Sequence, residues 1–150
     1  MVSMLAANVD VKNNVGNITV EKCNFMRVSC KSDTGKIVVN ESVATNWNLK
    51  TDANRIECHL VAGEVEAKSS IGSIIYNAPS FAFPLKLKTD VGSIEVTTEQ
   101  VMHDGVISAK SDIGSISIYG KSDKNVTYGD GNIVVELKSN IGEVQVLQAN

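Results

Sequence analysis

Residues 85–96 read LKLKTDVGSIEV, and this phrase decides the fold. Leucine alternates with lysine before the turn, and isoleucine and valine stand two positions apart after it. Apolar residues at every second position are typical of a β-strand with one buried face. The glycine in the middle predicts a tight turn, because glycine adopts positive φ without steric cost. The phrase therefore predicts a strand, a turn and a second strand.

The same phrase recurs along the whole chain. Its copies cover residues 9–20, 28–39, 47–58, 65–76, 85–96, 107–118 and 135–146, and their starts are 19, 19, 18, 20, 22 and 28 residues apart. A period of about 20 residues is typical of a solenoid, in which each repeat buries its apolar face against its neighbours. We therefore predict an all-β fold, a single-stranded β-solenoid (β-helix) of about seven coils stacked in parallel and in register. An antiparallel sandwich is the alternative, but it predicts strands of alternating character.

The repeats also define the domain organisation. One domain is expected over residues 1–150, with a candidate N-terminal cap at 1–8, repeats over 9–146 and a tail at 147–150. The longest spacer, Tyr119–Val134, is expected to hold a further strand pair around Val126, Tyr128 and Ile133. The last copy is followed only by the short tail, so we expect one end of the stack to be poorly covered.

Three columns of residues describe the predicted turn. A glycine follows the lysine by four positions in six copies, and Asn54 takes its place in the third. A polar pair precedes it, as in Ser32-Asp33, Thr89-Asp90 and Ser111-Asp112, and its side chains are expected to bond neighbouring backbone amides. Between pair and glycine lies a residue that we expect to point inward in most copies: Val15, Thr34, Ala53, Ile71, Val91, Ile113 and Ile141.

Composition excludes several classes of protein. Apolar residues make up 43% of the chain and charged residues 21%, which favours a packed core over disorder. A net charge of −3 and an aromatic content of 5% argue against a nucleic-acid partner. The odd number of cysteines (Cys23, Cys30 and Cys58) predicts a reduced state or at most one bridge. Neither a signal peptide nor an apolar stretch of about 20 residues is visible, so the sequence as written predicts a cytoplasmic chain without a transmembrane segment.

The most regular polar feature is a column of lysines. One lysine stands at the same position of every copy: Lys12, Lys31, Lys50, Lys68, Lys88, Lys110 and Lys138. Parallel stacking would align them as a ladder on one edge of the solenoid, where they form a candidate binding site for a polyanion such as an acidic glycan or a teichoic acid. The plainer interpretation is a solvated edge that discourages sheet aggregation.

Metal binding is not predicted. His59 and His103 stand apart in the sequence, Cys58-His59 is an isolated Cys/His pair, and no CxxC or HxxxH spacing occurs. A calcium site around Asp130 in YGDGN lacks the EF-hand pattern, so a glycine-rich turn is the better interpretation. No cofactor-binding fingerprint is present.

Catalysis is not predicted either. No GxSxG elbow or phosphate loop is present. Paired carboxylates for glycoside hydrolysis are the remaining candidates, since β-helices often process polysaccharides, but stacking brings acids together by default. These candidates are Glu95, Glu99, Asp104 and Asp112.

The turn phrase, with lysine, Ser or Thr, a short polar residue and glycine, resembles a family of bacterial β-strand-repeat domains. This adhesin-like family is a domain of unknown function, and LKLKTDVGSIEV and ISAKSDIGSISIYG carry the resemblance most clearly. The resemblance extends over residues 9–146 and implies a β-solenoid at the cell envelope, with no established catalytic residues.

Three functions compete on these observations. The leading hypothesis is a non-enzymatic binding or adhesin-like module that presents a repetitive surface at the bacterial cell envelope, to a polyanion, a glycan or a protein partner. The alternative is a scaffold that self-associates end to end through the solenoid ends. A polysaccharide-active enzyme is the third and weakest.

Overall fold

The chain forms two stacked sheets that share one core. The computed structural model describes residues 8–22, 24–59, 62–78, 84–99, 104–120, 122, 124–131 and 133–148. The first sheet contains β1 (Asn8–Val15), β3 (Asn24–Thr34), β5 (Val43–Ala53), β7 (Ala62–Ile71), β9 (Leu85–Val91), β11 (Gly105–Ile113), β13 (Asn125–Tyr128) and β14 (Ile133–Ile141). The second contains β2 (Ile18–Glu21), β4 (Ile37–Asn40), β6 (Ile56–His59), β8 (Ile74–Ala78), β10 (Ile94–Thr98), β12 (Ile116–Ile118) and β15 (Val144–Gln148).

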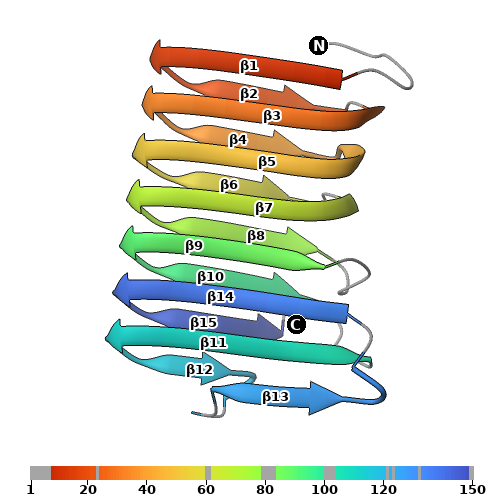
Figure 1. Cartoon of the computed structure of the whole chain (residues 1–150), viewed down its shortest axis with the longest axis vertical. Coiled ribbons are helices and arrows are strands. Elements are labelled where there is room, and N and C mark those ends of the chain that lie inside the picture. Colours follow the sequence, from red (N-terminus) through yellow and green to blue (C-terminus); the bar gives the residue numbers. More distant parts are fainter. Residues whose placement is uncertain are drawn as a thin grey trace.

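Each copy of the phrase supplies one strand to each sheet (Figure 1). We number these repeats in chain order: repeat 1 is β1–β2, repeat 2 is β3–β4, repeat 3 is β5–β6, repeat 4 is β7–β8, repeat 5 is β9–β10, repeat 6 is β11–β12 and repeat 7 is β14–β15. Neighbouring repeats pair in parallel, with equivalent residues opposite one another. The predicted all-β fold with parallel stacking is thus confirmed, and the antiparallel sandwich is excluded.

The core lies between the two sheets and consists of the repeated apolar columns. From the first sheet, Trp47 and Leu49 are at most 1% exposed, and from the second, Ile56 and Cys58 are fully buried. The equivalent side chains of repeats 2 to 7 are almost all buried as well. Each inward residue therefore packs against its own counterparts in the repeats above and below, which is why residue type recurs down a column.

Repeat 7 does not lie at the end of the stack. Its strand β14 pairs with β9 on one side and with β11 on the other, and β15 lies likewise between β10 and β12. Figure 1 shows the blue pair β14 and β15 inserted between the green strands of repeat 5 and the cyan strands of repeat 6. The expectation that the last copy ends the stack is therefore wrong, because the chain skips one position after repeat 5 and fills it later.

The long spacer between repeats 6 and 7 performs this crossing. The strand β13 pairs antiparallel with β11, so Gly105 faces Tyr128 on one side and Ile133 on the other. The chain passes around the start of β11 at Gly129 and Gly131, whose φ angles are 58° and 75°. The Asp104 carboxylate holds this crossing by accepting a hydrogen bond from the Asp130 backbone N–H at 3.0 Å. The spacer thus contains a strand at Val126 and Tyr128, as expected, whereas Ile133 already belongs to β14.

The glycine turns stack so closely that backbone touches backbone. A Cβ atom at Gly142 would lie 2.0 Å from the carbonyl oxygen of Gly92, and at Gly114 it would lie 1.9 Å from that of Gly142. No side chain fits at such distances, so glycine is needed for space as well as for its φ of 145° at both positions. In repeat 3, Asn54 adopts a φ of 142° instead.

The polar pair before the glycine ties each repeat to the next. Ser139 donates its hydroxyl hydrogen to the Gly92 carbonyl at 2.8 Å, and Ser111 donates to the Gly142 carbonyl at the same distance. The equivalent bonds are Ser32 to Gly16, Thr51 to Gly35, Ser69 to Asn54 and Thr89 to Gly72. These hydroxyls bond carbonyls of the adjacent repeat and not neighbouring amides, which corrects the prediction from the sequence.

The residue between the polar pair and the glycine points outward, contrary to expectation. Val15, Ile71, Val91, Ile113 and Ile141 are 44–77% exposed. Thr34 is also exposed and Ala53 is half-buried. The physical reason is that the interior beside the turn is already filled by the Ser and Thr side chains and by the stacked glycine backbone. A branched apolar side chain has no room there.

Candidate functional site

The lysine column forms one continuous ladder across the outer face of the first sheet. Strand register aligns the lysines in the spatial order Lys12, Lys31, Lys50, Lys68, Lys88, Lys138 and Lys110. Neighbouring parallel strands lie about 4.8 Å apart, so seven charges are spaced at this interval along the stack. The ladder runs along the middle of the sheet face and not along an edge, and the inserted repeat 7 supplies one of its members.

The ladder lysines have no carboxylate partner among the described residues. The ion pairs within 4.0 Å in that part of the chain are Lys36–Glu57, Arg55–Glu57 and Lys86–Glu136, and none includes a ladder lysine. Lys31, Lys50, Lys88 and Lys138 are half-buried, while the remaining three are exposed. Half-burial is usual for a lysine on a sheet face, because its aliphatic stem can lie against neighbouring side chains while the ammonium group stays in water.

Two columns of mostly acidic and neutral polar residues flank the ladder on the same face. The column toward the turn is Asn14, Asp33, Asp52, Ser70, Asp90, Asn140 and Asp112. The column on the other side is Asp10, Ser29, Asn48, Glu66, Lys86, Glu136 and Ser108. Residues two apart on one face of a strand are separated by roughly 7 Å, so these acids face the lysines without contacting them. Apart from Lys86, which pairs with Glu136, the positive charge of these three columns is therefore confined to the ladder.

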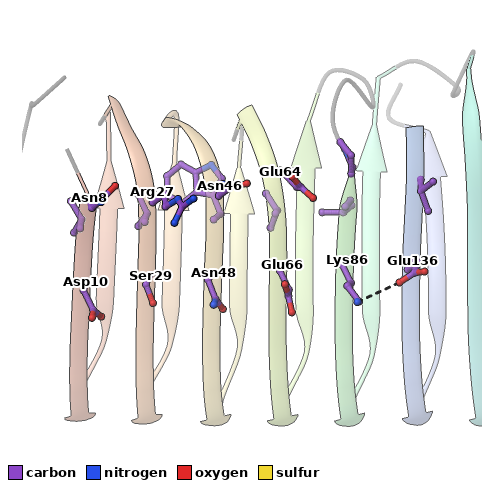
Figure 2. A pocket seen from close by; sticks show the side chains of 17 residues that line it. Asn8, Asp10, Arg27, Ser29, Asn46, Asn48, Glu64, Glu66, Lys86 and Glu136 are labelled. Carbon is purple, nitrogen blue, oxygen red and sulfur yellow. Dashed lines mark ion pairs between the residues drawn. The ribbon is translucent and has the colours of Figure 1, made fainter. Parts of the chain in front are cut away.

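A shallow groove of about 680 Å³ lies beside the ladder, over the first halves of the long strands (Figure 2). It crosses β1, β3, β5, β7, β9 and β14, and two columns of outward side chains line it. Among them are the amides of Asn8, Asn46 and Asn48 and the hydroxyl of Ser29. Figure 2 shows these side chains standing in rows across the strands, so the groove runs in the same direction as the ladder.

The groove carries charged side chains of both signs, with four carboxylates against one arginine and one lysine. Lys86 and Glu136 form an ion pair at 3.8 Å. In the amide orientation that satisfies its neighbours, the Asn46 nitrogen lies 3.3 Å from a carboxylate oxygen of Glu64. Arg27 points from β3 toward β5 and Asn46 (Figure 2). Two further carboxylates, of Asp10 and Glu66, line the wall. The groove thus combines hydrogen-bond donors and acceptors without an excess of positive charge.

The two described cysteines belong to the core. Cys30 and Cys58 are free thiols, and both are at most 1% exposed. Burial raises the pKa of Cys58 to about 12, with Cys30 and Glu57 adding to the effect. Burial and the charge of Asp10 raise the pKa of Cys30 to about 11. Both thiols therefore stay protonated and unreactive at neutral pH. Cys23 lies outside the described residues.

The residues considered for metal binding do not come together in the described part of the chain. His59 is half-buried, and its Nδ1 lies 2.9 Å from the Asn77 amide nitrogen of the adjacent repeat. No group of three or more His, Cys, Asp or Glu side chains able to hold a metal is found among the described residues. Asp130 sits in the crossing turn with its backbone bonded to Asp104, as the glycine-rich turn predicts. His103 lies outside the described residues.

The candidate catalytic carboxylates lie on different surfaces. Glu95 projects from β10 on the outer face of the second sheet, and Glu99 follows that strand directly. Asp112 belongs to the acidic column on the first sheet, and Asp104 holds the crossing turn.

The sequence did not reveal the groove, because the two columns that line it vary in residue type from repeat to repeat. The one feature of the sequence that pointed to the groove was the strand alternation, which places the residues of both columns on the outer face of the sheet.

Comparison with known proteins adds a family to this description. In the part of the chain that the structure describes, no helix is long and apolar enough to cross a membrane. No curated protein and no solved structure matches the chain. The model of one family, Toastrack DUF4097, a domain of unknown function, matches residues 2–147. This match supports the predicted solenoid-like repeat fold and carries no information about an adhesin role. The chain belongs to the Toastrack DUF4097 family.

Proposed function

We propose that this protein is a non-enzymatic binding module whose lysine ladder holds an extended anionic polymer at the bacterial cell envelope, in the manner of an adhesin. One observation carries the proposal. All seven ladder lysines are in register and none has a carboxylate partner among the described residues, even though repeat 7 enters the stack out of order. In this proposal, the seven repeats each contribute one lysine to a single extended binding site.

Electrostatics explains what such a ladder gains from an anion. Two unit charges about 4.8 Å apart repel by about 0.9 kcal/mol in water before salt screening. A bound chain of negative charges relieves this repulsion along the whole ladder. The columns on either side are mostly acidic or neutral, and their one lysine, Lys86, is paired with Glu136. The attractive strip is therefore narrow, which favours a single extended polymer over a broad anionic surface such as a membrane.

Edge protection explains the ladder less well than binding does. Lysine protects a sheet when it stands on an exposed edge strand. Only two ladder lysines lie on such edges within the described structure: Lys12 on β1, and Lys110 on the part of β11 beyond Gly105–Ser108, the segment that β13 covers. The other five lysines lie on interior strands of the sheet, where no edge needs protection.

The test is binding of the purified chain to isolated cell envelopes and wall polymers over a range of salt concentrations. The ladder variant changes Lys68, Lys88 and Lys138 to Gln, which removes three consecutive members in space. The control variant changes Lys22, Lys36 and Lys124 to Gln, which alters net charge equally but leaves the ladder intact. We expect salt-sensitive binding that falls by about tenfold or more in the ladder variant and persists in the control. Equal loss in both variants, or no binding by the parent chain, would contradict the proposal.

A second candidate function, end-to-end self-association, has its own observation. At the repeat 1 end, β1 and β2 each have one unpaired edge in the described structure, and Val9 and Val11 are only partly buried. Asn8, expected to belong to a cap, is the first residue of β1, and residues 1–7 lie outside the described residues. Light scattering over a range of concentrations tests this candidate, and a monomer at every concentration would contradict it.

A further inference from the structure

We propose that the groove and the lysine ladder together form a site for an acidic polysaccharide, with the anionic groups on the ladder and the sugar hydroxyls in the groove. This inference rests on the proposed function, since it names the class of polymer that the ladder would hold. It adds a second set of contacting residues, the uncharged side chains of the groove, and it assigns them the recognition of the sugar.

The geometry places the two contacts side by side. The nearer groove column, which includes Ser29 and Asn48, stands two residues before the ladder lysines on the same strand face. The farther column, which includes Arg27 and Asn46, stands four residues before them. The two columns therefore lie roughly 7 and 14 Å from the ladder. A polymer lying along the stack meets ammonium groups on one flank and the groove on the other.

The side chains of the groove favour a polymer whose facing side is neutral and rich in hydroxyl groups. Amide and hydroxyl side chains donate and accept hydrogen bonds, and carboxylates accept them from sugar hydroxyls. The carboxylates of Asp10, Glu64 and Glu66 would repel a phosphate or sulfate placed there, while Lys86 is already neutralised by Glu136 at 3.8 Å. An anionic chain without hydroxyl groups therefore gains from the ladder alone, whereas an acidic polysaccharide gains from both.

Among the described residues, the site offers no aromatic platform for stacking a sugar ring. The one aromatic residue in the groove, Trp47, is 1% exposed because its side chain packs in the core. Each repeat then contributes only weak polar contacts, and affinity accumulates because the same contacts recur along the stack. We therefore expect long polymers to bind more tightly than short oligomers of the same sugar.

The experiment compares three probes on the full chain: polygalacturonate, inorganic polyphosphate of similar charge number, and neutral dextran. The groove variant changes Ser29, Asn46 and Asn48 to Ala, which leaves net charge unaltered. Its control changes Thr19, Thr97 and Ser117 to Ala on the second sheet, and the fold of each variant is checked by thermal unfolding. The ladder variant with Lys68, Lys88 and Lys138 changed to Gln is measured beside them.

We expect the groove variant to lose about tenfold in affinity for polygalacturonate and to keep its polyphosphate affinity within about twofold. The ladder variant should lose both, and dextran should bind weakly throughout. Polyphosphate binding as tight as polygalacturonate binding, or a groove variant that leaves polygalacturonate affinity unchanged, would overturn the inference while leaving the ladder proposal standing. If neither anionic polymer binds the parent chain, the proposed function fails and this inference fails with it.

Discussion

Repeat 1 and repeat 7 carry the same sequence phrase but occupy opposite situations in the stack. Repeat 1 has one neighbour among the described strands, and its core residues Val9 and Val11 are only partly buried. Repeat 7 has a neighbour on each side, and its equivalent residues Val135 and Leu137 are at most 1% exposed. Position in space, and not position in the chain, therefore decides how much a repeat contributes to stability.

The largest expected effect comes from removing each repeat in turn. Deleting residues 133–148 leaves β11 and β12 separated from β9 and β10, so the parallel ladders on both sides of the gap are lost together. Deleting residues 8–22 removes only one interface. We expect the first deletion to lower the unfolding midpoint by more than the second, because it removes the strand pairings on both faces of repeat 7 and the second removes those on one face of repeat 1. Equal midpoints in the two deletions, followed by circular dichroism, would contradict this view of the stack.

A second comparison concerns the turn glycines. A Cβ atom at Gly142 would collide with the Gly92 carbonyl oxygen, whereas at Gly16 its nearest neighbour is the amide nitrogen of Asn13, at 2.9 Å. Both glycines have positive φ, so both substitutions carry backbone strain, but only the first forces two backbones apart. We expect Gly142→Ala to lower the free energy of unfolding by about 3 kcal/mol and Gly16→Ala by about 1 kcal/mol. Denaturant titration measures both, and equal losses would show that the contact between backbones is unimportant.

Truncation of two equivalent core valines, one in repeat 7 and one in repeat 1, is expected to give a smaller difference in stability. Val146 in repeat 7 is fully buried, and its counterpart Val20 in repeat 1 is 8% exposed with a neighbour on one side only. Truncation to Ala leaves a cavity whose cost depends on how completely the site is enclosed. We expect a loss on the order of 2 kcal/mol for Val146→Ala and about half of that for Val20→Ala. Denaturant titration measures both losses of unfolding free energy. A larger loss for Val20→Ala than for Val146→Ala would contradict this prediction.

The smallest expected effect concerns the hydroxyl that links adjacent repeats. Ser139 bonds the Gly92 carbonyl, whereas Asn13, at the same position of repeat 1, has no further repeat to bond within the described structure. Ser139→Ala should cost about 1 kcal/mol, the typical contribution of one partly buried hydrogen bond. Asn13→Ala should change stability by less than about 0.5 kcal/mol. A Ser139→Ala chain as stable as its parent would show that the hydroxyl bond is dispensable.

The regular parts of the fold could be predicted because each depends on local periodicity. The alternation of apolar and polar residues predicted the strands. The lysine at the same position of every repeat predicted a ladder. The strand register confirms both. The outward turn residues were mispredicted because alternation takes no account of volume. Ile71 and Ile113 follow the strand period, but the stacked glycine backbone leaves no interior space for them.

The insertion of repeat 7 was missed because every repeat is equally compatible with every other. Because the repeats carry similar residues at equivalent positions, any two of them could pair in parallel. The repeated sequence therefore does not indicate which repeats are neighbours in the stack. The spacers did hold a signal, since the starts around repeat 6 are 22 and 28 residues apart where the others differ by 18 to 20. Extra length is what a chain needs to skip a position and then to cross back around β11.

The out-of-order insertion has a consequence for how the protein is made and how it can lengthen. Because β14 and β15 follow β11 and β12 in the chain, repeat 6 leaves the ribosome before the neighbour that connects it to repeat 5. Domains usually fold as units during synthesis, and here the unit stays incomplete until the layer between repeats 5 and 6 is made. A duplicated repeat placed before β1 would stack on an edge that no other described strand covers, whereas one placed after β12 would disturb the crossing turn. Growth by duplication is thus open in one direction and closed in the other.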